Sequence, residues 1–240
     1  MKALLVLMIS LLAYSKNITY TVGGNDYEGY IINQGKNAPT VLIIHDWDGI
    51  TDYEIKRAQM FKELGYSVFA ADMYGKGIRP AEIPERKKMT KSLYDNRIKM
   101  RELLNEAINE AQKQGLNTKQ MIAVGYCFGG TSVLELARSG KKLTGFVSFH
   151  GGLETPEGQS YKGATAPITI FHGTADTAVT MDHFANIAKE MEENNVPHEM
   201  ITYSGAPHAF SVFGSERYRK DADMKSWKRL TEILKEQFKK

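Results

Sequence analysis

The sequence is poor in cysteine, with a single one, Cys127, among its 240 residues. One thiol cannot form a disulfide within the chain or supply a structural zinc site of the multi-cysteine type. An excess of charge of one sign is also missing, because 31 basic residues face 28 acidic ones and leave a net charge of +3. Nucleic-acid binding requires a clustered basic face, so we expect no nucleic-acid partner.

Long apolar runs are absent as well. With 42% hydrophobic and 25% charged residues, the composition is typical of a globular protein and excludes both wholesale disorder and a polytopic membrane protein. No repeat, low-complexity segment or Pro/Gly-rich linker divides the chain. We therefore expect one domain with a proper core.

The N-terminus has the layout of a secretory signal peptide. Lys2 is followed by an apolar run at 3–13, too short to span a bilayer as a helix, and Ala13 and Ser15 are small residues at −3 and −1 of a cleavage site. This pattern predicts a signal peptide at 1–15, a domain at 16–240 and a periplasmic or secreted location. No cysteine follows for lipid attachment, so no stable membrane anchor is expected. The alternative is that the run is a helix or strand of the domain.

Strand-length apolar runs alternate with helical patterns in the rest of the chain. We expect a hairpin from 19–22 and 27–32, and further strands at 41–45, 67–71, 120–125, 144–149, 167–171 and 199–203. Helices are expected at 52–64, 93–114, 128–138, 181–194 and 215–238, and a polar loop at 76–91. This alternation predicts an α/β fold, with a mostly parallel sheet covered by helices on both faces. Ligands bind such sheets at the carboxyl ends of the strands.

The cysteine lies in a sequence typical of a nucleophile elbow. The segment 125–130, Gly-Tyr-Cys-Phe-Gly-Gly, stands between a predicted strand and a predicted helix. Side chains two positions before and after the nucleophile would collide in so tight a turn, and Gly125 and Gly129 avoid this. The amino end of the following helix favours the thiolate. We interpret Cys127 as a nucleophile, the alternative being a buried structural cysteine.

An acid and a histidine follow in the chain order of α/β-hydrolases, which is nucleophile, acid, base. Asp176 follows the strand at 167–171, and His208 follows the last strand. His208 would take the proton of Cys127, and Asp176 would hold the imidazole in the right tautomer. Each residue alone could be an ordinary loop residue, and the joint match carries the prediction.

An oxyanion hole requires two backbone N–H groups. We expect them from Phe128, directly after the nucleophile, and from Trp47 in the loop after the strand at 41–45. Asp46 and Trp47 would then line the site. Tyr74 and Phe210 are either further walls of an apolar pocket or ordinary core residues.

The sequence resembles the dienelactone hydrolase (carboxymethylenebutenolidase) family of α/β-hydrolases from about Tyr20 to the C-terminus. The resemblance rests on the elbow at 125–130, Ala-Asp-Met-Tyr-Gly at 71–75, His-Gly-Thr-Ala-Asp at 172–176 and His-Ala-Phe at 208–210. It implies an α/β-hydrolase fold, a Cys127–His208–Asp176 triad, and an oxyanion hole from the amides of Trp47 and Phe128.

Two positions depart from the family pattern. The family enzyme that opens dienelactone has a glutamate beside its thiol where this chain has Asp46, and an arginine that binds the substrate carboxylate where this chain has Val212. Lys76 or Arg79 could supply a positive charge instead. These differences argue against dienelactone itself as the substrate.

We therefore expect a cysteine-dependent hydrolase of small esters, lactones or thioesters that needs no cofactor. The six histidines form no metal signature, so no metal is expected. Arg86, Lys87 and Lys88 are interpreted as the start of a solvated helix. Two alternatives stay open: a catalytically degenerate scaffold that binds a small molecule, and, ranked last, a redox-sensing thiol. The sequence leaves the oligomeric state open.

Overall fold

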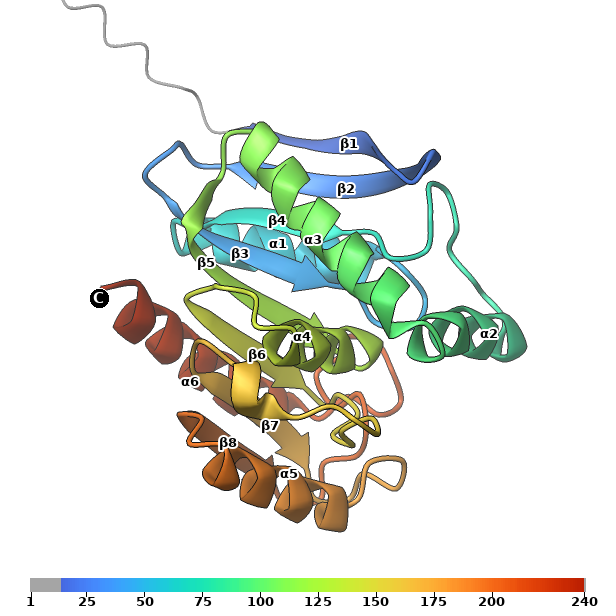
Figure 1. The fold of residues 1–240 in the computed structure, drawn as a ribbon, viewed down its shortest axis with the longest axis vertical. Coiled ribbons are helices and arrows are strands. Elements are labelled where there is room, and N and C mark those ends of the chain that lie inside the picture. Colours follow the sequence, from blue (N-terminus) through green and yellow to red (C-terminus); the bar gives the residue numbers. More distant parts are fainter. Residues whose placement is uncertain (1–13, 240) are drawn as a thin grey trace, which may run out of the picture.

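The computed structural model describes residues 14–239, and in this range one mixed sheet forms the centre of the protein (Figure 1). Its strand order is β1-β2-β4-β3-β5-β6-β7-β8. The strands are β1 (Tyr14–Val22), β2 (Asn25–Asn33), β3 (Pro39–Ile44), β4 (Ser67–Ala71), β5 (Asn117–Tyr126), β6 (Gly145–Phe149), β7 (Ile168–Gly173) and β8 (His198–Tyr203). The first two form an antiparallel hairpin, β2 pairs antiparallel with β4, and all later pairs are parallel. The predicted sheet and hairpin are therefore confirmed.

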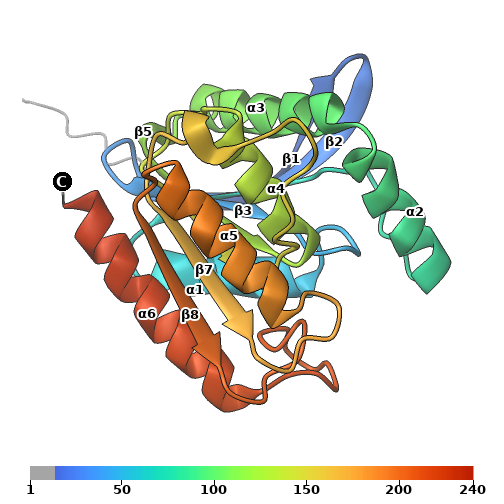
Figure 2. The same ribbon diagram turned by 60° about the horizontal axis from the view of Figure 1, so that its bottom comes forward.

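Helices cover both faces of the sheet (Figures 1 and 2). They are α1 (Asp52–Glu63), α2 (Ile83–Tyr94), α3 (Arg97–Lys113), α4 (Phe128–Arg138), α5 (Met181–Glu193) and α6 (Lys220–Phe238). Successive residues of β3 point to opposite faces of the sheet. Leu42 packs in the core beneath α3, α4 and α5, and Val41 packs in the core that includes α1 and α6. Both cores are closed to water, as a parallel sheet requires.

The segment predicted as a loop at 76–91 differs from the structure, because most of it belongs to α2. Pro84 lies in the first turn of α2, where its missing N–H costs nothing. The single helix predicted at 93–114 is divided at Asp95 and Asn96. The side chain of Asn96 accepts a hydrogen bond from the Lys99 amide at 2.9 Å and starts α3.

The last helix begins later than predicted, at Lys220, because residues 215–219 form turns, with the Tyr218 amide bonded to the Ser215 carbonyl. The first strand begins earlier, at Tyr14. Ser15, the residue before the predicted cleavage site, pairs with Ile32 in the hairpin. The apolar run at 3–13 lies outside the described residues. Within 14–239, no helix has both the length and the apolar character that crossing a membrane requires.

Candidate active site

The nucleophile elbow connects β5 to α4 as the glycine pattern predicts. Cys127 has a φ of +51°, a conformation that L-residues rarely adopt. A side chain on Gly125 would collide with the backbone of Gly129, and one on Gly129 would collide with the carbonyl of Ile44 in β3. The two glycines thus allow the strained turn to lie against its neighbours and hold the sulfur at the carboxyl end of the sheet.

Three side chains far apart in the sequence meet at this edge. His208 Nε2 lies 3.1 Å from the Cys127 sulfur, and His208 Nδ1 lies 2.7 Å from Asp176 Oδ2. The other oxygen of Asp176 accepts hydrogen bonds from the amides of Ala178 and Val179, each at 2.9 Å. Burial alone would raise the pKa of Asp176, but the His208 hydrogen bond and these amides hold it below its usual range. An ionised Asp176 fixes the imidazole with Nε2 facing the sulfur.

The thiol differs from the sequence expectation in its protonation. Burial raises the pKa of Cys127 well above its usual value, and the negative charge of Asp46 raises it further. The Phe128 amide at the start of α4 lowers it, as expected of a helix N-terminus, but this effect is smaller than the other two. The resting group is therefore a thiol, and the His208 imidazole, 3.1 Å from the sulfur, is the neighbouring group able to accept its proton.

The loop between β3 and α1 carries the second predicted oxyanion donor. The Trp47 amide contacts the side-chain oxygen Oδ1 of Asp46. Asp46 is only 5% exposed, and burial together with Asp48 and Glu54 raises its pKa well above the usual range. Because the Asp46 side chain contacts the Trp47 amide in this structure, that N–H is not free to donate to an oxyanion.

Glu54 holds this loop from inside the protein. Its Oε1 accepts from the Asp46 amide at 3.3 Å, and its Oε2 accepts from the amide and hydroxyl of Thr51, each at 2.8 Å. Thr51 is the N-cap of α1, and the pair forms a capping box. One fully buried carboxyl thereby ties both ends of the loop 46–51, and burial raises its pKa to about 7.

A pocket of about 680 Å³ opens over the thiol, a size suited to a small ligand. Beside Cys127 and His208, its walls include Trp47, Val212 and Phe213. Arg86, Lys87 and Arg217 also line it, so cationic groups from α2 and from the loop before α6 contribute to the same pocket. Arg86 packs over the Trp47 ring at 5.3 Å from its centroid and lies 3.7 Å from Asp48.

The sequence left Tyr74 and Phe210 open between the pocket walls and the core, and the structure favours the core for both. Phe210 is fully buried and packs against His150 and Tyr203 in the core, away from the pocket. Tyr74 also lies behind the pocket, where its hydroxyl donates to the Trp47 carbonyl at 3.2 Å. Both residues instead support the walls from inside.

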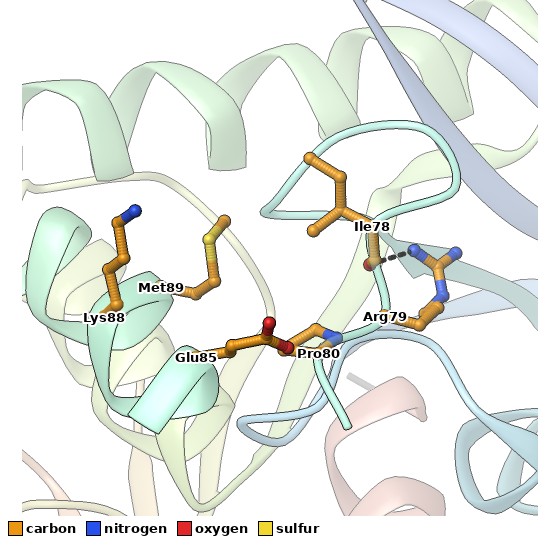
Figure 3. A pocket seen from close by; sticks show the side chains of 6 residues that line it. All are labelled: Ile78, Arg79, Pro80, Glu85, Lys88 and Met89. Atoms are coloured by element: carbon orange, nitrogen blue, oxygen red, sulfur yellow. Dashed lines mark hydrogen bonds between the residues drawn. The ribbon is translucent and has the colours of Figure 1, made fainter. Parts of the chain in front are cut away.

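The guanidinium of Arg79, one of two residues that the sequence offered as a source of positive charge, is engaged elsewhere. It donates to the carbonyl of Ile50 at 2.6 Å and to that of Ile78 at 2.7 Å, and it pairs with Glu28 at 3.1 Å. Figure 3 shows the Arg79 guanidinium directed toward the Ile78 carbonyl. Both residues line a separate hollow of about 310 Å³ that lies between the loop at 78–80 and α2. Neither Arg79 nor Lys76 lines the pocket over the thiol. Among residues 14–239, no cluster of three or more His, Cys, Asp or Glu side chains could hold a metal ion.

Neither His150 nor Ser211 was among the candidate site residues identified from the sequence. The Nδ1 of His150 accepts from the Cys127 amide at 3.2 Å, and its Nε2 contacts the Ser211 hydroxyl at 2.9 Å. Val212, Phe213 and Arg217 were not expected in the pocket walls either. No spacing signal identifies them, because the segment after His208 forms turns that bring it back over the site.

The chain is similar to known proteins over most of its length. The dienelactone hydrolase family matches residues 27–238. Protein usf of Aquifex pyrophilus is 27% identical over 203 residues, covering 80% of this chain and 85% of its own. A Yersinia pestis protein named "Putative carboxymethylenebutenolidase" is 22% identical over 222 residues, covering 86% of this chain and 82% of its own.

Among solved structures, a dienelactone hydrolase-like promiscuous phosphotriesterase, P91, from metagenomic libraries superposes with a TM-score of 0.85 at 25% identity. The alignment covers 93% of this chain and 98% of that one. The match extends over nearly the whole sheet and its helices, so the fold is shared.

Proposed function

The chain belongs to the dienelactone hydrolase family, and from this premise we propose that it hydrolyses small esters, lactones or thioesters through Cys127, His208 and Asp176. The observation that carries the proposal is the continuous contact from sulfur to imidazole to carboxylate, at 3.1 and 2.7 Å. Family membership supports the hydrolase class. The cysteine mechanism and the substrate range are our own inference.

The reaction proceeds in two halves. His208 Nε2 takes the proton of Cys127 as the sulfur bonds to the substrate carbonyl carbon, and the carbonyl oxygen becomes an oxyanion. The amides of Trp47 and Phe128 would stabilise that charge, which requires Asp46 to turn away from the Trp47 amide. The C–O or C–S bond to the leaving group then breaks, and His208 protonates the leaving group. Water, deprotonated by His208, attacks the thioester, and the carboxylic acid and the thiol are released.

The test is turnover of short-chain nitrophenyl esters, a simple lactone and a thioester by the wild type, Cys127→Ala and His208→Ala. We expect kcat/KM to fall by about 10³-fold or more in both variants, because each removes one residue of a triad whose three members act together. A phosphotriester belongs in the panel, since the similar structure is named a promiscuous phosphotriesterase. Equal turnover by wild type and Cys127→Ala would refute the cysteine mechanism.

The second candidate is a binding protein with a degenerate site. It is favoured by the raised pKa of Cys127, by the contact of Asp46 with the Trp47 amide, and by Val212 in place of an arginine. Absence of turnover across the whole panel, with saturable protection of Cys127 from iodoacetamide by a ligand, would support this function. Turnover that depends on Cys127 would exclude it.

We also propose that the protein is exported and cleaved after Ser15. Support comes from the positive, apolar and small-residue regions at 1–15. Cleavage there would remove Tyr14 and Ser15 from β1 and leave the strand from Lys16 onward. N-terminal sequencing of the protein recovered from cell fractions tests this proposal, and an intact N-terminus in the cytoplasmic fraction would contradict it.

A further inference from the structure

His150 is a buried titratable group that the proposed reaction does not use. It follows β6 at the carboxyl edge of the sheet, is fully buried, and has a φ of +39°. A residue other than glycine in this conformation is strained, and such strain is retained where the surroundings hold the residue firmly. Here the His150 residue is held by contacts to both ring nitrogens and by ring contacts with His208 and Phe210.

The two ring nitrogens of His150 bond to different parts of the site. The Cys127 N–H is shared between the Phe149 carbonyl at 3.0 Å and His150 Nδ1 at 3.2 Å. With Nδ1 as an acceptor, Nε2 carries the proton and donates to the Ser211 hydroxyl at 2.9 Å. Ser211 lies three residues after His208, on the same loop. Burial keeps the ring neutral and lowers its pKa well below the usual value, with His208 and Arg57 adding to the shift.

Two side chains of α1 also hold the His208 loop at Ser211. The Arg57 guanidinium donates to the Ser211 carbonyl at 2.9 Å, and the Ser211 hydroxyl lies 3.0 Å from the Tyr53 hydroxyl. The His150 ring also meets the His208 ring edge-on, with centroids 5.4 Å apart. His208, Arg57 and His172 are the cationic or titratable neighbours that oppose a positive charge on His150.

We propose that His150 is a positioning residue: by bonding the Cys127 amide with one nitrogen and Ser211 with the other, it sets the distance between the thiol and the His208 imidazole. It does not touch the substrate, because it is fully buried beneath the pocket. The inference builds on the proposed triad, but its main readout, the reactivity of Cys127, needs no substrate.

Three substitutions separate the two bonds. His150→Asn leaves an acceptor near the Cys127 amide but does not reach Ser211, His150→Gln leaves a donor toward Ser211, and His150→Phe removes both. His198→Phe on β8 is the matched control, because it replaces a partly buried histidine outside the pocket. Ser211→Ala removes the same contact from the other side.

The measurement is the rate of Cys127 alkylation by iodoacetamide between pH 6 and 10, in each variant and in each variant combined with His208→Ala. We expect the pH profile of alkylation in His150→Phe to move toward that of His208→Ala. The profiles of His150→Asn and His150→Gln should lie between those of the wild type and His150→Phe. The profile of His198→Phe should match that of the wild type. Since His150 acts through His208, its substitution should have little further effect in the His208→Ala background.

Where esters are turned over, kcat should fall about 10- to 100-fold in His150→Phe with KM within about threefold, as expected of a misplaced catalytic pair. An unchanged alkylation profile in His150→Phe, or an effect equally large without His208, would overturn the inference. If His150→Phe does not fold, the alkylation profiles of His150→Asn, His150→Gln and Ser211→Ala test the inference in the same way. A shifted profile in a protein that hydrolyses nothing would refute the proposed function and leave the positioning role supported.

Discussion

Cys127 and Asp46 are the residues whose chemistry depends most on their surroundings. Next to burial, the charge of Asp46 is the largest influence that raises the pKa of the thiol. The family pattern has a glutamate at this position, and the shorter Asp46 contacts the neighbouring Trp47 amide. The same carboxyl therefore affects both the proposed nucleophile and the proposed oxyanion donor.

Asp46→Asn should make Cys127 more reactive. The negative charge of Asp46 raises the pKa of Cys127, and an asparagine at position 46 removes that charge while keeping a side chain of similar size. We expect the alkylation rate near pH 8.5 to rise by about threefold to tenfold. Asp52→Asn, at an exposed position on α1, is the control and should behave as the wild type. A slower rate in Asp46→Asn would show that Asp46 activates the thiol instead.

Among the elements, α1 and its preceding loop are joined by a buried titratable group. Glu54 caps α1 through Thr51 and holds the Asp46 amide at the other end of the loop. Its pKa of about 7 lies above the usual glutamate value of 4.5, because burial disfavours the charged form. The folded protein thus holds this proton over a pH range in which the unfolded chain has released it.

This difference predicts a pH dependence of stability. The stabilisation from Glu54 is present in full below about pH 4.5 and is lost as pH rises through about 7, a change on the order of 3 kcal/mol. Glu54→Gln cannot titrate. The unfolding free energy of the wild type minus that of Glu54→Gln should therefore decrease between pH 5 and pH 8, as measured by urea denaturation. A constant difference would contradict the raised pKa.

The boundary between α2 and α3 is an element that the sequence pattern misplaced. The apolar periodicity of 93–114 continues through the break because Leu93 is buried as the later apolar positions are. Only cap geometry distinguishes two helices from one, and Asn96 gains its capping bond once the chain turns there. Leu93 is the one residue of α2 that is buried, and α2 extends away from the sheet (Figure 2).

At the scale of the whole molecule, α1 and α6 are joined by the buried ion pair of Arg57 and Asp223. Arg57 also reaches the loop behind His208 through the Ser211 carbonyl. Both side chains are almost fully excluded from water, so neither is stabilised by solvent if its partner is removed. The pair therefore links the packing of two helices to the placement of the loop that carries His208.

Arg57→Met should destabilise the protein by about 3–5 kcal/mol, because it leaves the Asp223 carboxylate buried without its cationic partner, although the Tyr218 hydroxyl still donates to it at 3.1 Å. Lys91→Met is the matched control, since the Lys91–Asp95 pair is exposed and contributes about 0.5 kcal/mol or less. Urea denaturation of the two variants and the wild type measures the difference. Equal stability of all three would mean that Asp223 finds another partner or is neutral.

The sequence by itself determined the sheet, its hairpin and the elbow. These follow from local rules: β-branched runs form buried strands, and only glycine fits at 125 and 129, where backbones lie almost in contact. It also identified Cys127, Asp176 and His208 as candidates, since the strand ends that carry them share one edge of the sheet.

The tertiary structure alone decided what surrounds those residues. Burial and the charge of Asp46 reverse the expected protonation of the thiol, and Phe210 packs in the core although it lies two residues from His208. His150 and Ser211 are 61 positions apart, and their contact exists only because β6 and the last loop meet behind the elbow. Electric fields and burial depend on distances in space, which residue spacing along a chain does not encode.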